Sequence, residues 1–171
     1  MLVVDDFLWD EHFWKASIVV SDDRLADGPV PLVFAPEGRG EGPITGDELE
    51  LLRIATDGLD ATVALAAAAL YGQYTSLQLA YDYDDHDKAS FMPDIRTAEE
   101  IYALINVVGV NVHPLSRDGI PYVGVEFDTR WDPEHGAGVL INGKRVVEVG
   151  GVDSAVLLWI AEEDLQSGTA P

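Results

Sequence analysis

The densest group of side chains capable of chemistry lies between residues 126 and 138, where a predicted strand runs into a loop. Asp128, Asp132 and His135 could together hold a divalent cation, because hard and borderline metals accept carboxylate and imidazole ligands. With Glu134 nearby in the sequence, such a site would support a metal-assisted hydrolase. The spacing matches no established metal motif, and a tight loop built on Asp and Gly is the favoured interpretation. We therefore expect no metal and no cofactor.

A second acidic segment covers residues 82–87 and begins like a calcium-binding loop. The position that needs glycine holds Asp87, and the twelfth position, where a bidentate Glu belongs, holds Pro93. The segment is therefore predicted to be a solvated acidic loop. Its Asp84 and Asp85 are candidates for contact with a partner rather than for metal binding.

No other stretch of the chain carries a catalytic pattern. The four histidines are isolated from one another in the sequence, and no G-x-S-x-G nucleophile motif is present. The glycine-rich residues 38–42 lack the Lys-Ser/Thr of a phosphate-binding loop and include a carboxylate that would repel phosphate. The sequence therefore names no catalytic residue and favours a non-enzymatic protein.

The charge of the chain narrows the class of partner. The 171 residues include ten Lys and Arg and 31 Asp and Glu, which gives a formal net charge of −21. DNA, RNA and anionic membrane surfaces are repelled by such a charge, whereas a basic protein is attracted. The absence of cysteine and of a positively charged leader fits a cytoplasmic protein. The longest apolar run, residues 61–71, is too short to span a bilayer.

The elements that would position these side chains begin with an N-terminal hairpin. Residues 13–20 and 30–34 are apolar runs separated by turn residues, which predicts two antiparallel strands. The aromatic residues at 7–14 are expected to cover the sheet, the alternative being an exposed recognition surface. Residues 36–43 are a glycine-rich connector, so that residues 1–43 form the first part of a single domain spanning residues 1–171.

Helices are predicted where capping signals precede periodic apolar residues. Thr45 and Glu48 form a capping box, which predicts one long helix over residues 47–71 that Gly58 could kink or split and Gly72 could end. Residues 77–83 alternate like a strand. A second capping box at residues 97–100 predicts a short helix ending near residue 107.

The C-terminal half is predicted to be a strand meander. Asn142-Gly143 indicates a type I′ turn between strands at 138–142 and 144–149, which follow strands at 108–112 and 122–128. Asp153 could cap a final helix over residues 155–163, and residues 166–171 are expected to fray. The fold class is therefore α+β, with a mostly antiparallel sheet, one long helix and two shorter helices.

Three segments near the C-terminus carry a family resemblance: YVGVEF at 122–127, WDPEHGAGV at 131–139 and RVVEVGGVD at 145–153. Together they resemble an uncharacterised bacterial family of small acidic cytosolic proteins, a domain of unknown function. This resemblance implies no established activity. In size and acidity the chain is similar to immunity-type proteins, which neutralise toxins.

Three functions remain open at this point. The favoured one is a protein-binding module, in the form of an immunity-type inhibitor of a basic toxin or another cationic partner. A metal-assisted hydrolase using Asp128, Asp132 and His135 is the alternative, and a structural or regulatory module is the third. The candidate partner-binding residues are Trp131, Asp132, Glu134, His135, Asp84 and Asp85.

Overall fold

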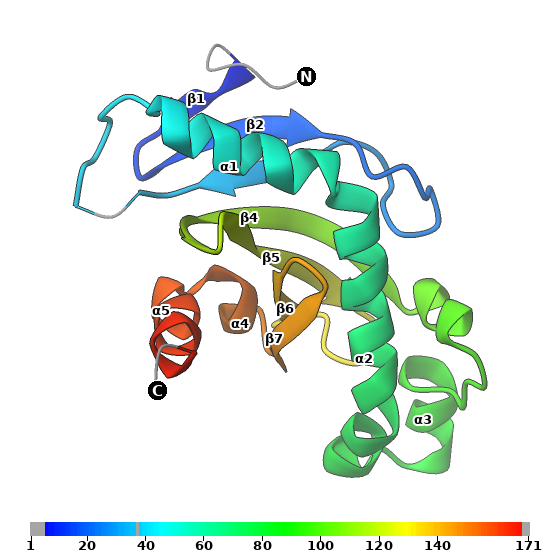
Figure 1. The fold of residues 1–171 in the computed structure, drawn as a ribbon. Helices are drawn as coiled ribbons and strands as arrows, with labels where there is room; N and C mark the ends of the chain where they lie inside the picture. The colour runs from blue at the N-terminus through cyan, green and yellow to red at the C-terminus, as the bar shows by residue number, and fades with distance from the viewer. Residues whose placement is uncertain (1–5, 37, 169–171) are drawn as a thin grey trace.

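The computed structural model describes residues 6–36 and 38–168 and contains one seven-stranded sheet with helices on both faces (Figure 1). The strands lie in the sheet in the same order as in the chain. The strands are β1 (Leu8–Asp10), β2 (Phe13–Ile18), β3 (Val30–Phe34), β4 (Ile105–Arg117), β5 (Ile120–Thr129), β6 (Ala137–Asn142) and β7 (Arg145–Gly150). The helices are α1 (Gly46–Asp57), α2 (Leu59–Tyr81), α3 (Asp85–Phe91), the 3₁₀ helix η2 (Ala98–Ala103), α4 (Asp153–Val156) and α5 (Leu158–Ser167).

The prediction of an α+β fold with a mostly antiparallel sheet is confirmed. Strands β4 to β7 form an antiparallel meander, and β1 to β3 form an antiparallel N-terminal unit. The two units join through β3 and β4, which are parallel, so the sheet as a whole is mixed. Because parallel neighbours need a crossover, the chain between them runs through α1, α2, α3 and η2.

The segment predicted as one helix over residues 47–71 is split at Gly58, a break that the sequence left open, and its predicted end is wrong. The capping box at Thr45 is present and starts α1, but the chain breaks at Gly58, where α1 and α2 meet at 64°. The Gly58 N–H bonds to the carbonyl oxygens of Ile54 and Thr56, which closes α1 before α2 begins. Gly72 lies inside α2, where a Cβ would meet nothing within 4 Å, so neither crowding nor a turn ends the helix there.

The predicted strand over residues 77–83 is also wrong, because α2 continues to Tyr81. The Gln78 side chain on this last part of the helix donates to the Met92 carbonyl oxygen at 2.8 Å, and Tyr74 donates to that of Pro93 at 3.0 Å. These contacts to the chain beyond α3 stabilise a helix in a segment whose local pattern indicates a strand. Tertiary contacts therefore override the alternation.

The acidic loop predicted at residues 82–87 is helical only in its second half, because α3 begins at Asp85. The Asp84 carboxylate accepts hydrogen bonds from the backbone N–H groups of His86 and Asp87, at 3.0 and 2.9 Å, and so caps the helix. The capping box at Thr97 is present as predicted, but it starts the short η2, and β4 begins at Ile105, before the predicted helix end.

The hairpin between β6 and β7 is present, but its turn is not type I′. Asn142 pairs with Arg145, so the central residues are Gly143 and Lys144, of which only Gly143 has a positive φ, 63°. This is the arrangement of a type II′ turn. Asn142 stays in the strand, where its side-chain amide donates to the Ile120 carbonyl oxygen at 2.8 Å.

The single final helix predicted at residues 155–163 is two helices. Leu157, with ψ of 115°, is extended and separates α4 from α5. Asp153 is the first residue of α4 rather than its cap. Of the tail predicted to fray, residues 166 and 167 are helical, while 169–171 lie outside the described residues.

The two faces of the sheet are covered unequally. Helices α1 and α2 pack on one face and bury the main core, which includes Leu32, Phe34 and Val125. On the second face, α4 lies against Gly124, where a Cβ would meet the Ala155 carbonyl oxygen at 1.9 Å. A smaller cluster forms under α5, and the part of this face over β2 and β3 is left open.

The N-terminal aromatic side chains are mostly half-buried. Phe7 is buried, while Trp9 and Trp14 meet edge to face with ring centroids 5.5 Å apart. Trp14 also donates from Nε1 to the Gly42 carbonyl oxygen at 3.3 Å, which ties the glycine-rich connector to β2.

The described residues include no single helix long and apolar enough to cross a membrane. The bent pair α1 and α2 meets that criterion only when taken together, by length and composition.

Candidate functional site

The structure brings the two acidic segments into contact at one corner of the molecule. The Tyr81 hydroxyl donates to Asp132 Oδ2 at 2.7 Å, and the Tyr83 hydroxyl donates to the Trp131 carbonyl oxygen at 2.8 Å. Arg130 donates to the Ser90 carbonyl oxygen at 2.5 Å. We call this surface, residues 81–91 and 130–135, the acidic corner.

Trp131 is the internal support of the acidic corner. Its side chain is 2% exposed and packs edge to face against Tyr74, with ring centroids 5.6 Å apart. A partner approaching from solvent does not reach the indole. Its position therefore supports the interpretation that the aromatic ring is scaffold, whereas the carboxylates that follow it are accessible.

Asp132 is held by three donors. Besides Tyr81, it accepts from His135 Nδ1 at 2.8 Å and from the His135 backbone N–H at 3.2 Å. Partial burial opposes ionisation of Asp132, but these hydrogen bonds outweigh burial and lower its pKa. Conversely, the hydrogen bond to Asp132 raises the pKa of His135, and burial together with the same carboxylate raises the pKa of Tyr81 to about 12. Asp132 is thus a fixed, ionised carboxylate.

A small cavity of about 180 Å³ opens beside this group. It lies between α2 and the β5–β6 loop, and Tyr81, Asp132 and His135 line it together with the main core side chain Leu70. Asp132 is the one carboxylate among its lining residues, and it already accepts hydrogen bonds from Tyr81 and His135.

The outer surface of the acidic corner combines carboxylates with aromatic rings. Asp84, Asp85 and Glu134 are exposed, as the sequence analysis expects for partner-binding residues. The Tyr83 ring stacks on Tyr81 and contacts Phe91, each at a centroid separation of 5.7 Å. Tyr81 and Phe91 are 37% and 40% exposed. In the sequence, the only signal of these aromatic residues is their place beside the acidic run.

The proposed metal-ligand set does not come together. His135 contacts Asp132, but Asp128 lines a different hollow with Asn106 and Pro133. In the described part of the chain, no three His, Cys, Asp or Glu side chains are placed to hold a metal ion. The geometry therefore gives the hydrolase interpretation no assembled site.

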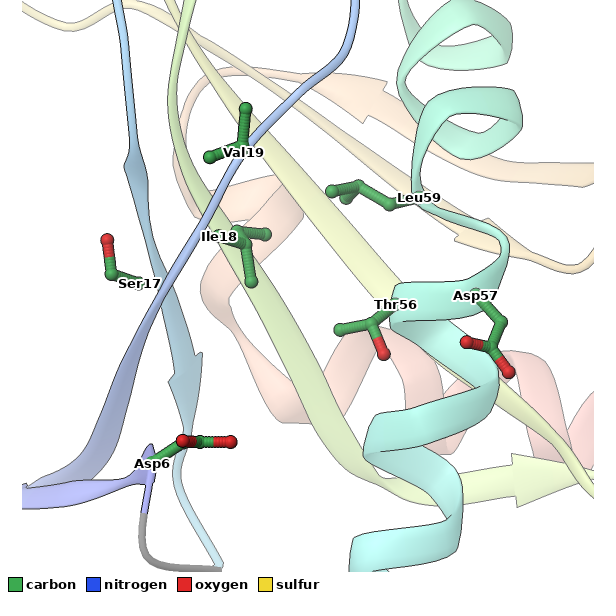
Figure 2. A pocket seen from close by; sticks show the side chains of 7 residues that line it. All are labelled: Asp6, Ser17, Ile18, Val19, Thr56, Asp57 and Leu59. Carbon is green, nitrogen blue, oxygen red and sulfur yellow. The ribbon is translucent and has the colours of Figure 1, made fainter. Parts of the chain in front are cut away.

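A groove of about 550 Å³ lies between the end of β2 and the break from α1 to α2 (Figure 2). Asp6 and Asp57 lie on opposite sides of this groove. The Thr56 hydroxyl is already bonded to the carbonyl oxygens of Leu52 and Arg53, both at 3.0 Å. The groove adds the exposed carboxylates of Asp6 and Asp57 to the surface.

The cations of the chain leave most of its carboxylates unneutralised. At least seven of the ten Lys and Arg form ion pairs with Asp or Glu, namely Lys15, Arg24, Arg39, Arg53, Lys88, Arg117 and Arg145. The chain has 31 Asp and Glu against these ten cations, so an excess of 21 carboxylates remains.

Comparison with known proteins places the chain in a family. Residues 10–157 match the family model described as a domain of unknown function, DUF6985, and the chain belongs to this family. No curated protein and no solved structure matches it. The match covers strands β2 to β7 and the acidic corner but ends before α5.

Proposed function

We propose that this member of the DUF6985 family is a non-enzymatic protein-binding module that engages a basic protein through its acidic corner. The observation that carries the proposal is the meeting of two acidic segments around exposed aromatic rings. Aromatic residues are common anchors of protein interfaces, and carboxylates around them select a cationic partner. Tyr81 and Phe91 supply the rings, and Asp85 and Glu134 supply exposed charge.

The charge of the whole chain supports the same function. A net charge of −21 raises the rate of encounter with a basic partner by roughly 10–10³ where electrostatic steering operates. An enzyme needs only a few of these carboxylates, whereas steering uses them all. An immunity-type inhibitor of a basic toxin, acting in the cytoplasm, is the form of this function that size and acidity favour.

The corner is also rigid enough to recognise a partner without refolding. Asp132 is fixed by three donors, and the β5–β6 loop is bonded to α3 through Arg130. A preformed surface loses little conformational entropy on binding.

The experiment begins with the gene next to the one that encodes this chain. An immunity-type protein is expected beside a basic protein, whose purified form is then titrated by surface plasmon resonance at rising salt. The association rate should fall steeply between low salt and 0.15 M, where the Debye length is about 8 Å, while dissociation changes less.

Matched variants localise the interface. Asp85→Asn with Glu134→Gln should slow association by about threefold to tenfold. Glu162→Gln with Glu163→Gln removes the same charge from α5, which Figure 1 shows well apart from α3, and should slow it less. Equal effects of the two pairs, or no complex at low salt, contradict the proposal.

A further inference from the structure

A second cleft, of about 360 Å³, lies on the opposite face of the sheet from α1 and α2. Its floor is formed by Asn111 and His113 of β4 and Glu126 of β5, and the break between α4 and α5 forms one wall. The C-terminal helices leave this part of the second face uncovered. A concave site with apolar walls and a few convergent polar groups is typical of small-ligand binding.

His113 presents an acceptor to this cleft. The residue is 4% exposed, and its Nε2 lies 3.0 Å from the carbonyl oxygen of Ala155. Because a carbonyl oxygen only accepts, Nε2 carries the proton. Burial lowers the pKa of His113, so the ring is neutral and Nδ1 has a free lone pair.

Asn111 and Glu126 add two more acceptors. The Asn111 side chain donates from Nδ2 to Glu126 Oε1 at 2.6 Å, which leaves the amide oxygen of Asn111 and the second carboxylate oxygen of Glu126 available. Gly109 makes room for this arrangement, since a Cβ there would lie 2.7 Å from Glu126 Oε1. No Lys or Arg forms an ion pair with Glu126 among residues 6–36 and 38–168.

These acceptors are accessible rather than sealed. Within the described residues, Nε of Arg39 is the only fully buried side-chain nitrogen or oxygen without a hydrogen-bond partner. The remaining acceptor atoms of Asn111, His113 and Glu126 therefore reach the cleft that these residues line. A site with three acceptors, one of them charged, requires a ligand rich in N–H donors and positive in charge.

The walls of the cleft are apolar and therefore favour a ligand with an apolar chain. Phe13 and Val33 lie on one side, and Val156 and Leu157, both partly exposed, lie on the other. The chain's own ammonium group, Lys15 Nζ, lies 4.8 Å from the centroid of the Phe13 ring, within the range of a cation–π contact. Lys15 is held there by an ion pair with Asp10 at 2.5 Å.

We propose that this cleft binds a primary alkylammonium ion, with its three N–H donors on Glu126, Asn111 and His113 and its alkyl chain against Phe13 and Leu157. The three donors of an ammonium group match the three acceptors in number. The site is separate from the acidic corner, and its failure would leave the protein-binding proposal untouched.

The test is a calorimetric titration of the full chain with n-hexylamine at pH 7, followed residue by residue with amide NMR shifts. Binding is expected with hexylamine and absent with 1-hexanol and hexanoate, which share the chain but lack the ammonium group. Glu126→Gln keeps the acceptor for Asn111 and should weaken binding by about tenfold or more, because a charge-assisted hydrogen bond is lost.

Asp128→Asn is the matched control, since it removes one charge from the same strand outside the cleft and should leave hexylamine binding unchanged. Leu157→Ala tests the wall separately and should weaken hexylamine more than ethylamine. A blocked lysine, Nα-acetyl-lysine methylamide, tells whether the ligand is a protein side chain or a free amine. If both hexylamine and the blocked lysine bind, the cleft can take a partner's lysine. If only hexylamine binds, the ligand is a free amine. Equal binding of hexanol, equal loss in Asp128→Asn, or no binding of either amine overturns the proposal.

Discussion

Asp164 fixes helix α5 to the sheet, and replacing it with Asn should lower the free energy of unfolding by an amount that can be worked out from the structure. Its carboxylate accepts two hydrogen bonds from Arg145, at 2.7 and 2.6 Å, and one from the Tyr122 hydroxyl at 2.7 Å. Arg117 completes the group at 3.4 Å. These groups belong to β4, β5 and β7, so a single side chain ties the C-terminal helix to three strands.

The magnitude follows from the pKa of this carboxyl. The hydrogen bonds from Arg145 lower the pKa of Asp164 to about 2, against an ordinary 3.8. At 1.36 kcal/mol per pH unit this difference corresponds to about 2 kcal/mol of stability at pH 7. Because the folded-state pKa is the lower one, the contribution is complete above pH 5 and is lost as the pH falls towards 2. At pH 3 about half should remain.

The assay is urea unfolding of the native protein and of Asp164→Asn between pH 7 and pH 3. Asn keeps the shape of the side chain and can still accept from Tyr122, so the difference between the two proteins isolates the charge. That difference should be about 2 kcal/mol at pH 7 and about half as large at pH 3. Glu163→Gln, an exposed neighbour on the same helix, should change stability by less than about 0.5 kcal/mol. A difference that does not vary with pH would refute the electrostatic account.

Two further predictions concern the acidic corner. Trp131→Ala should lower the free energy of unfolding by about 3–5 kcal/mol in a denaturation experiment, because it removes a fully buried indole; a loss below 1 kcal/mol would show that the ring is not scaffold. Asp132→Asn should return the raised pKa of His135 towards its ordinary value in an NMR titration of the imidazole, since the carboxylate is the main cause of the shift. An unchanged His135 titration would contradict the 2.8 Å contact.

The strands were predictable because their signals are local. The apolar runs at 13–18 and 30–34, and the turn glycines at 119 and 143, determine pairing between neighbours in the sequence. The parallel contact between β3 and β4 has no such signal, because the residues that pair are separated by four helices. At the β6–β7 turn, Asn142 stays in the strand and its side chain donates to Ile120, a contact that its neighbours in the sequence do not indicate.

The helices were harder to place because their ends depend on tertiary contacts. Gly58 and Gly72 are the same residue type in one apolar segment, yet only Gly58 breaks the helix. The acidic candidates Asp84 and Glu134 are exposed in the structure, as their charge predicts. Of the aromatic residues beside them, Tyr81 ends a helix in a segment predicted as a strand, Tyr83 follows that helix and Phe91 ends α3. Their shared surface with the β5–β6 loop could not be inferred locally.

The glycines inside the strands all serve the second face of the sheet. A Cβ at Gly124, Gly138 or Gly150 would meet α4 or the segment leading into it, and one at Gly109 would meet Glu126. In the described strands these four are the only glycines, and each costs roughly 0.5–1 kcal/mol relative to alanine. Together the four glycines lower the free energy of unfolding by about 2–4 kcal/mol, against a typical total of about 5–15 kcal/mol for a folded protein. Gly124, Gly138 and Gly150 let α4 approach the sheet and so position one wall of the cleft. Gly109 makes room for the Glu126 carboxylate on the floor of the cleft. The apolar face under α1 and α2 needs no strand glycine. The conformational cost of these glycines is therefore paid at the cleft and not in the main core.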